Sequence, residues 1–348
     1  MRNIENIIVT GASGFIGSNF IKNLLEDQNF GKDLKTITNI DKLTYAGDRE
    51  NNLDYENNPK YNFINGDICD QDLISSLLKE FDVDVIINFA AESHVDNSIE
   101  SPDEFIQTNI FGTFNLLRCL QEFNSSLNKS AIILHVSTDE VFGSLKLNDP
   151  GFTEKNSYKP NSPYSASKAS SDHLVQAWHK TYGLPTLITN CSNNYGPNQN
   201  FEKLIPKIIK CAVNKEEITI YGDGKNIRDW LYVDDHCKGI IKVLLEGKFG
   251  ETYNIGGKNE ISNIEIAKII CNLLENAYPF DKNPIKSNLY NSYEGLISFV
   301  SDRLGHDFRY SIDPSKIEKD LDWYPEETFE TGITKTISWY LEKLIKND

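Results

Sequence analysis

Short apolar runs alternate with amphipathic stretches through the first half of this 348-residue chain, and this alternation is the strongest constraint on its fold. The apolar runs have the length of buried strands, and the stretches between them have helical periodicity. Alternation of this kind predicts an α/β fold, a doubly wound parallel sheet with helices on both faces. The predicted strands are 7–9, 36–40, 61–64, 85–89, 131–136 and 186–190, and the predicted helices are 15–25, 70–81, 103–122 and 163–182.

A glycine motif joins the first predicted strand to the first predicted helix. Gly11, Gly14 and Gly17 are spaced G-x-x-G-x-x-G, which lets a backbone turn tightly and approach a pyrophosphate at the positive helix N-terminus. Asp41 closes the next strand, where a carboxylate binds ribose hydroxyls and repels a 2′-phosphate. We therefore predict a Rossmann-like site that prefers NAD to NADP. The alternative is a structural turn with a surface aspartate.

Two further strand ends fit the same site. Asp67 and Ile68 follow the third predicted strand, where adenine would lie, and Ala90 and Ser93 follow the fourth, towards the nicotinamide. Each pair could instead be a simple strand-end cap, so this prediction depends on the glycine motif upstream.

A tyrosine and a lysine share one face of the predicted helix 163–182. Tyr164 and Lys168 are four residues apart, and such residues are neighbours on a helix surface. A neighbouring ammonium stabilises a phenolate, so we expect the pKa of Tyr164 to fall towards neutrality. Such a tyrosine can accept the proton of a hydroxyl while hydride leaves the same carbon. The pair therefore predicts alcohol oxidation, against the alternative of a core aromatic and a solvated lysine.

Two carboxyl groups follow the fifth predicted strand. Thr138 is expected to hydrogen-bond the oxygen being oxidised, and Asp139 and Glu140 come directly after it. Adjacent carboxyls in an enclosed site have their pKa values pushed apart, which gives one acid and one base. Oxidation alone needs neither group, whereas elimination of water needs both. A turn or helix-cap pair is the alternative.

Together these motifs resemble the extended short-chain dehydrogenase/reductase family and, within it, the nucleotide-sugar 4,6-dehydratases that act on dTDP-glucose. The resemblance runs nearly end to end, and Thr138-Asp139-Glu140 is the part that indicates a dehydratase. The matching stretches are 11–17, 39–47, 90–96, 137–143, 164–168, 190–197, 221–224, 228–230 and 302–307.

The resemblance implies further contacts. For NAD they add Phe15, Ile16, Lys42, Thr44 and Thr108, with Tyr164 and Lys168 shared between cofactor and chemistry. For the nucleotide sugar they are Ser93, His94, Thr138, Asn193, Lys203, Leu204, Tyr221, Arg228, Asn263, Arg303 and His306.

The two arginines are the expected diphosphate ligands, since guanidinium groups bind phosphate in bidentate fashion. Each could instead pair with a neighbouring aspartate. The chain departs from the family pattern at Leu304, at Phe308 and in the longer, polar segment 278–293, which leaves the nucleotide end of the substrate less defined.

The second half of the chain is irregular. Polar segments at 193–200 and 276–293 separate short helices, so we expect a smaller C-terminal substrate-binding domain. The predicted division is 1–190 for NAD, with part of 226–256 returning to it, and 191–348 mainly for the nucleotide sugar.

Bulk properties bound the function. A net charge of −16 argues against a nucleic-acid or anionic-membrane surface. The six histidines and six cysteines have no metal-binding spacing. The start of the chain leads directly into a strand, so we expect no signal peptide and a cytoplasmic location.

Three predictions stay open on sequence alone. A sugar-nucleotide 4-epimerase has the same fold and Tyr-Lys pair but no use for Asp139 and Glu140, and a non-catalytic NAD-binding protein is the rival from another class. We also expect a homodimer through the helices 103–122 and 163–182, because they carry excess apolar residues. These residues are Phe105, Ile110, Phe114, Leu117, Leu174 and Trp178.

Overall fold

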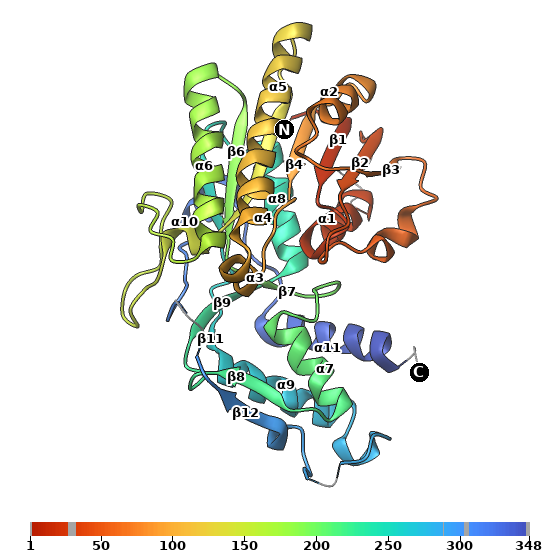
Figure 1. Cartoon of the computed structure of the whole chain (residues 1–348), viewed down its shortest axis with the longest axis vertical. Coiled ribbons are helices and arrows are strands. Elements are labelled where there is room, and N and C mark those ends of the chain that lie inside the picture. Colours follow the sequence, from red (N-terminus) through yellow and green to blue (C-terminus); the bar gives the residue numbers. More distant parts are fainter. Residues whose placement is uncertain (1, 27–32, 288, 303–305, 346–348) are drawn as a thin grey trace.

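The computed structural model describes residues 2–26, 33–287, 289–302 and 306–345. Its main feature is a seven-stranded sheet with the order β10-β6-β5-β4-β1-β2-β3, in which every neighbouring pair is parallel (Figure 1). The predicted doubly wound parallel sheet is thus confirmed. The strands are β1 (Asn6–Thr10), β2 (Thr36–Asp41), β3 (Tyr61–Asn65), β4 (Val85–Asn88), β5 (Ile132–Thr138), β6 (Thr186–Cys191) and β10 (Thr252–Ile255).

Two hydrophobic cores lie on opposite faces of this sheet. Ile7 and Val9 point to the core on one face and Ile8 to the core on the other, as the period of two along a strand requires. Helices α1, α8 and α10 supply the first core, and α2, α5 and α6 the second. These helices are α1 (Phe15–Glu26), α2 (Gln71–Glu80), α5 (Thr113–Leu127), α6 (Pro163–Tyr182), α8 (Val233–Glu246) and α10 (Ser315–Leu321).

Helix α6 begins and ends as the sequence predicts. The Ser162 hydroxyl accepts from the Ser165 N–H, and the Ser165 hydroxyl accepts from the Ser162 N–H. Pro163 is the first helical residue. The helix ends at Gly183, which has a positive φ of 69°. The N-terminal cap fixes the start of α6, one residue before Tyr164.

The prediction of one regular helix over 103–122 is wrong. The segment is divided into α4 (Pro102–Phe105), a π-helical stretch at Ile106–Gly112, and α5, and a separate short helix, α3 (Val95–Glu100), precedes it. Within the π stretch, the Asn109 side chain both donates to and accepts from the backbone of Glu92. A tertiary contact of this kind favours the wider turn, and π turns occur often at functional sites.

A smaller part lies below the carboxyl edge of the large sheet (Figure 1). It contains a three-stranded sheet, β11-β9-β7, and a parallel pair, β12-β8, around its own hydrophobic core. Strand β10 and helix α8 follow β9 in sequence but pack with the large sheet. The elements are β7 (Asn193–Tyr195), β8 (Ile218–Tyr221), β9 (Ile227–Tyr232), β11 (Glu260–Ser262), β12 (Ile297–Val300), α7 (Leu204–Asn214), α9 (Asn263–Ala277) and α11 (Phe329–Ile345).

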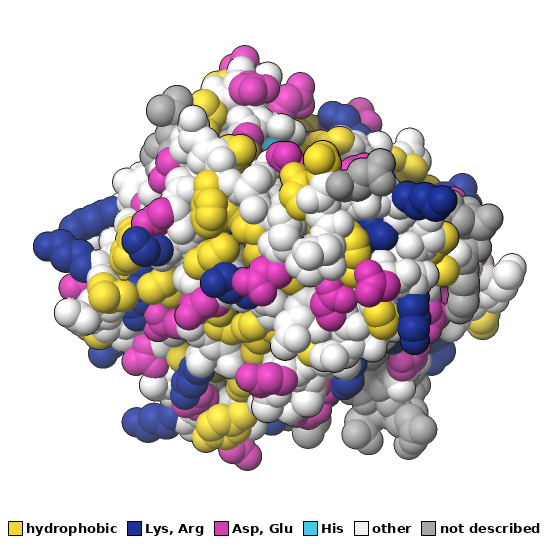
Figure 2. Space-filling view, turned by 90° about the horizontal axis from the view of Figure 1, so that it is seen from below, with side chains coloured by type: hydrophobic (Ala, Val, Ile, Leu, Met, Phe, Trp, Pro, Cys, Tyr) yellow, Lys and Arg dark blue, Asp and Glu magenta, His cyan; other side chains and the backbone are white. Residues whose placement is uncertain are grey.

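Charges of both signs are interspersed on the face of the smaller part that Figure 2 shows. Basic and acidic side chains alternate there with apolar ones, without a broad patch of one sign among the residues that are described. In the described part of the chain, no helix is both long and apolar enough to cross a membrane.

Candidate active site

A cavity of about 300 Å³ lies at the carboxyl ends of the strands of the large sheet. Much of its wall is built from residues at or just after the carboxyl ends of β1 to β6, which is where doubly wound sheets hold ligands. Every residue predicted to bind cofactor or to do chemistry lines this one cavity. They are Gly11, Gly14, Phe15, Ile16, Gly17, Asp41, Lys42, Thr44, Asp67, Ile68, Ala90, Ser93, Thr108, Thr138, Asp139, Glu140, Tyr164 and Lys168.

Two glycines of the motif are required by close backbone approach. Gly11 has a φ of 70°, and a Cβ there would lie 2.6 Å from the amide nitrogen of Ala90. A Cβ on Gly17 would lie 2.6 Å from the carbonyl oxygen of Gly11. A side chain at either position would push the strand-to-helix turn apart, so the motif holds the N-terminus of α1 against the cavity.

The carboxylate of Asp41 holds the glycine turn in place. Its Oδ2 accepts from the N–H of Ser13 at 2.9 Å and its Oδ1 from the N–H of Leu43 at 2.8 Å. Burial raises its pKa above the usual value, and these two bonds act against that shift. Nearby, the Lys42 Nζ lies 2.9 Å from the Asp67 Oδ2. Both predicted strand-end acids therefore lie on the cavity wall with defined partners.

The pKa of Tyr164 departs from the prediction. Burial raises it well above the usual value, and the negative charges of Glu140, Cys191 and Asp139 add to the shift, whereas a hydrogen bond with Thr138 opposes it. Lys168 directs its Nζ to the carbonyl oxygen of Val136, at 2.8 Å, and burial lowers its pKa to about 8. Contrary to the prediction from the sequence, the side chains around Tyr164 therefore do not by themselves lower its pKa towards neutrality.

Asp139 is a buried carboxyl with an unpaired oxygen. It is 2% exposed, its Oδ1 lies 3.3 Å from the Thr138 hydroxyl, and its Oδ2 has no hydrogen-bond partner among the residues that the structure describes. Burial and the charges of Glu140 and Asp229 raise its pKa well above the usual value, against the lowering effect of Arg228. The arrangement favours a protonated Asp139 beside Glu140, so one of the two adjacent carboxyls can donate a proton.

Two predicted substrate residues of the smaller part reach the cavity, Asn193 and Lys203. The Lys203 Nζ donates to the carbonyl oxygen of Ser93 at 3.1 Å and lies 3.5 Å from Glu202. This lysine thus joins the wall formed after β4 to the start of α7, across the cavity mouth.

Arg228 is placed elsewhere. Its guanidinium is buried under the Tyr310 ring, 4.4 Å from the centroid, and donates to the carbonyl oxygens of Ile227, Asp307 and Phe308. It does not line the cavity. In this structure its donors satisfy backbone groups, and its charge acts on Asp139 and Glu140 through space.

Ser93 and Thr138 line the cavity, whereas the remaining predicted substrate residues that the structure describes lie outside its wall. His94 accepts from the Asn97 N–H as the cap of α3, and His306 contacts Asp302 at 2.7 Å and the Tyr221 ring. Leu204 packs against the core of the smaller part, and Asn263 is the first residue of α9. Arg303 and Leu304 lie outside the described residues.

A family model described as GDP-mannose 4,6 dehydratase matches residues 8–336. The chain belongs to this family. The dTDP-glucose 4,6-dehydratase of Neisseria meningitidis serogroup B is 50% identical over 343 residues, 97% of this chain and 94% of its own length. The Haemophilus influenzae enzyme of the same name is 50% identical, with 97% and 98% covered.

A solved structure of a dTDP-glucose 4,6-dehydratase is also similar to this chain. DesIV, the dTDP-glucose 4,6-dehydratase from Streptomyces venezuelae with NAD and TYD bound, has a TM-score of 0.88 and 41% identity to this chain. The alignment covers 97% of both chains. The likeness therefore extends over the large sheet and the smaller part alike.

The sequence analysis did not predict several of the residues that line the cavity. Glu92, which is buried and hydrogen-bonded to Asn109, lines the wall after β4, and Cys191 and Ser192 line it at the end of β6. All lie within or beside stretches that carried the resemblance, and their place at strand ends was the signal that could have found them. Asn109 had no such signal, because nothing in its local sequence indicates a π turn.

Proposed function

We propose that this protein is an NAD-dependent nucleotide-sugar 4,6-dehydratase that converts dTDP-glucose to dTDP-4-keto-6-deoxyglucose. The observation that carries the proposal is Asp139, a buried carboxyl with a raised pKa, beside Glu140 in the cavity that also contains Tyr164. An acid and a base in an oxidising site meet the needs of water elimination. The names of the relatives, identical at up to 50%, support the same substrate.

The cavity fits NAD. The glycine turn leaves no room for side chains at Gly11 and Gly17, the N-terminus of α1 opens towards the cavity, and Asp41 ends the second strand. A pyrophosphate would lie at that helix end, with its ribose hydroxyls near the Asp41 carboxylate. When bound, NAD would supply a positively charged ring that can accept a hydride from the sugar and later return it.

Tyr164 starts the reaction as a base. It takes the proton of the glucosyl 4-hydroxyl as the C4–H bond gives up its hydride, and C4 becomes a ketone. Thr138, which hydrogen-bonds the phenol, holds the same oxygen. Since burial opposes ionisation of Tyr164, the phenolate needs the ammonium of Lys168 and the cofactor's charge to form.

Glu140 and Asp139 carry out the elimination. The new ketone acidifies the C5 proton, which Glu140 removes, while the protonated Asp139 gives its proton to the C6 hydroxyl. Water leaves and a C5–C6 double bond forms. Hydride then returns to C6 and a proton adds at C5, which restores the oxidised cofactor and leaves a 4-keto-6-deoxy sugar.

We propose the domain assignment on the same basis. Residues 1–190, with part of 226–256, would bind NAD, and 191–348 would mainly hold the nucleotide sugar. Asn193 and Lys203 on the cavity wall support this division. Tyr221, Arg228, Asn263, Arg303 and His306 would contact the nucleotide end, which extends beyond that wall.

We also propose a cytoplasmic homodimer. An aromatic strip runs along the π-helical stretch, α5 and α6. It is formed by Phe111, Phe114, Trp178 and Tyr182, and successive ring centroids lie 5.4–5.8 Å apart. Phe111 is 43% exposed and Tyr182 55%. Phe105 and Leu117, which the sequence placed in the interface, are instead buried in the monomer. Light scattering at micromolar concentration should give twice the chain mass; a monomer mass would refute the dimer.

Purified protein incubated with a panel of nucleotide sugars tests the function. We expect dTDP-glucose to lose the mass of one water, with no net consumption of NAD. An isomer of unchanged mass would identify a 4-epimerase. Tight cofactor binding without turnover of any sugar would identify a non-catalytic NAD-binding protein.

A further inference from the structure

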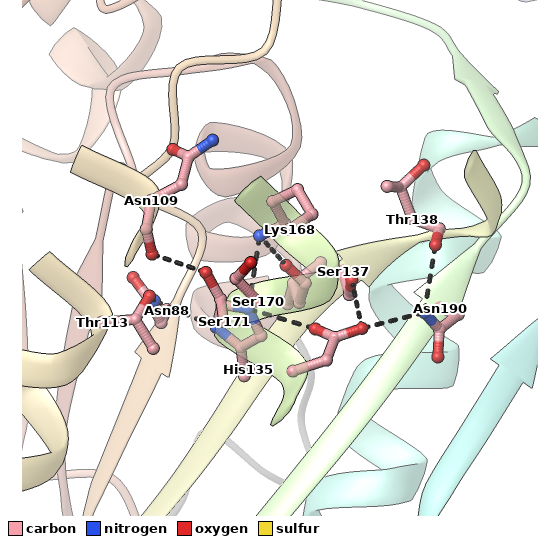
Figure 3. A network of polar contacts seen from close by, with 12 residues as sticks. Asn88, Asn109, Thr113, His135, Ser137, Thr138, Lys168, Ser170, Ser171 and Asn190 are labelled. Atoms are coloured by element: carbon pink, nitrogen blue, oxygen red, sulfur yellow. Dashed lines mark hydrogen bonds and ion pairs between the residues drawn. The ribbon is translucent and has the colours of Figure 1, made fainter. Parts of the chain in front are cut away.

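Lys168 has a second set of neighbours, on the side away from the cavity. Its Nζ lies 3.4 Å from the His135 Nε2, and Figure 3 shows both residues within one polar network between α6 and β5. His135 and Asp172 are buried, at 1% and 0% exposure, and neither lines the cavity. Buried polar networks of this kind are costly unless each member is satisfied, so the roles of its donors can be deduced.

The tautomer of His135 follows from a chain of hydrogen bonds. The Thr10 hydroxyl donates to the Asn88 Oδ1, at 2.6 Å, and accepts from the Ala90 N–H, at 3.3 Å. This fixes the orientation of the Asn88 amide, whose Nδ2 then donates to the His135 Nδ1, at 3.1 Å. A nitrogen that accepts carries no proton, so the neutral ring has its proton on Nε2.

The Nε2–H of His135 therefore points towards Lys168 and Asp172. The Asp172 Oδ1 lies 3.5 Å from the His135 Nε2, and its Oδ2 accepts from the Ser137 hydroxyl at 2.9 Å. A ring N–H facing the lysine can bond a neutral amine but not an ammonium, whereas the Asp172 carboxylate favours the ammonium. The two residues thus act on Lys168 in opposite directions.

Among the described residues, few other titratable groups act near this lysine. Tyr164 lies one turn away on α6, Cys191 acts on Lys168 from β6, and Asp139 and Glu140 act on Tyr164 from the same cavity wall. Asp172 is itself hydrogen-bonded by Tyr158 and by Asn190. Burial raises the pKa of Asp172 to about 6, and the pKa of Lys168 falls to about 8. In the pH range in which Lys168 loses its positive charge, Asp172 is therefore already negatively charged.

We propose that His135, held as the Nε2–H tautomer by Asn88, and Asp172 are positioning residues that set the protonation of Lys168 and, through it, the ionisation of Tyr164. The proposal rests on the proposed function, because it assigns Lys168 to hydride transfer. His135 and Asp172 would act from outside the cavity, without contact with cofactor or substrate. Its consequence is that the pH range of the oxidation step is set from the buried side of α6.

Asp172→Asn is the direct test. The exchange keeps the size of the side chain and removes the charge that favours the ammonium. We expect the alkaline limb of the single-turnover rate of cofactor reduction to move to lower pH by about 1 unit, since a close opposite charge shifts a pKa by 1–3 units. Asp235→Asn is the matched control, because Asp235 is equally buried, on α8, and does not line the cavity. It should lower stability without moving the limb.

An unchanged alkaline limb in Asp172→Asn, or the same displacement in Asp235→Asn, would overturn the proposal. A second measurement uses the unmodified protein without substrate and so does not depend on its activity. Nitrogen-15 NMR of the histidine rings, with His135 assigned by its loss in His135→Gln, should show protonated Nε2 and bare Nδ1 between pH 6 and 9. The opposite tautomer or an imidazolium would refute the tautomer argument. Failure of every nucleotide sugar to react would count against the proposed function while leaving this result intact.

Discussion

The two walls of the cavity differ in how far their positions follow from local sequence. On the large-sheet side, every residue predicted to bind the cofactor or to do chemistry lines the cavity, and many of these residues lie at or just after strand ends. On the side of the smaller part, Asn193 and Lys203 reach the cavity, whereas Tyr221, Arg228 and His306 form contacts outside it. Parallel strands joined by helices fix where their carboxyl ends lie; no such rule places the loops and short strands of the smaller part.

The largest effects should come from the large-sheet wall. Tyr164→Phe removes the first base, so no hydride should leave C4 and no reduced cofactor should appear. Glu140→Gln leaves Tyr164 and Lys168 intact, so the cofactor should be reduced and a 4-keto sugar that retains its C6 hydroxyl should accumulate. A general base contributes about 100- to 10,000-fold, so the overall block should be of that size.

Single-turnover absorbance of the reduced cofactor separates these two variants. If Glu140→Gln turned over at the unmodified rate, Glu140 would be a turn residue and the 4-epimerase alternative would gain support. If reduced cofactor forms in Glu140→Gln but not in Tyr164→Phe, then different side chains of this wall carry out oxidation and elimination.

A second prediction concerns the wall of the smaller part. Arg228→Ala removes a charged donor from three carbonyl oxygens, each of which keeps one other donor, and removes the packing of the guanidinium on the Tyr310 ring, so the free energy of unfolding should fall by about 2 kcal/mol. Arg309→Ala is the matched control, since Arg309 is similarly buried and donates to the backbone of Lys146 and Asp149. Denaturant titration should show comparable losses in both. If Arg228 also binds the diphosphate, only its variant will raise the KM for dTDP-glucose; equal KM values would make Arg228 purely structural.

A third prediction tests the cofactor end. Asp41→Ala should weaken NAD binding by about 10-fold or more, because it removes a charged acceptor for the ribose and also the anchor of the Ser13 and Leu43 N–H groups. Discrimination against NADP should relax in the same variant. Calorimetric titration with both cofactors measures the two effects, and equal affinity of the unmodified protein for NAD and NADP would contradict the role of Asp41.

A fourth and smaller effect concerns the core of the larger region. His236 is fully buried on α8, neither of its ring nitrogens has a hydrogen-bond partner in the described part of the chain, and burial lowers its pKa to about 3. The unfolded chain takes up a proton near pH 6.5 and the folded chain does not, so stability should fall as the pH drops from 6.5 towards 3. His236→Phe should flatten this dependence in denaturant titrations across that range. An equal slope in both proteins would exclude His236 as its cause.

The accuracy of the sequence predictions follows the same division. The six predicted strands and the capped helix α6 could be derived because each depends on local periodicity or on caps such as Ser162 and Gly183. The π turn around Asn109 depends on a distant backbone partner, Glu92. The Tyr164 pKa depends on burial that a spacing of four residues does not reveal. Periodicity thus predicts where side chains lie better than how they are solvated.

Transfer of the C4 hydrogen within one sugar tests the central claim most directly. dTDP-glucose deuterated at C4 would be converted in ordinary water, and the unlabelled substrate in deuterium oxide, with both products examined by mass spectrometry and NMR. The account predicts deuterium at C6 in the first product and at C5 in the second. Loss of the C4 label to solvent, or a product that retains its C6 hydroxyl, would contradict it.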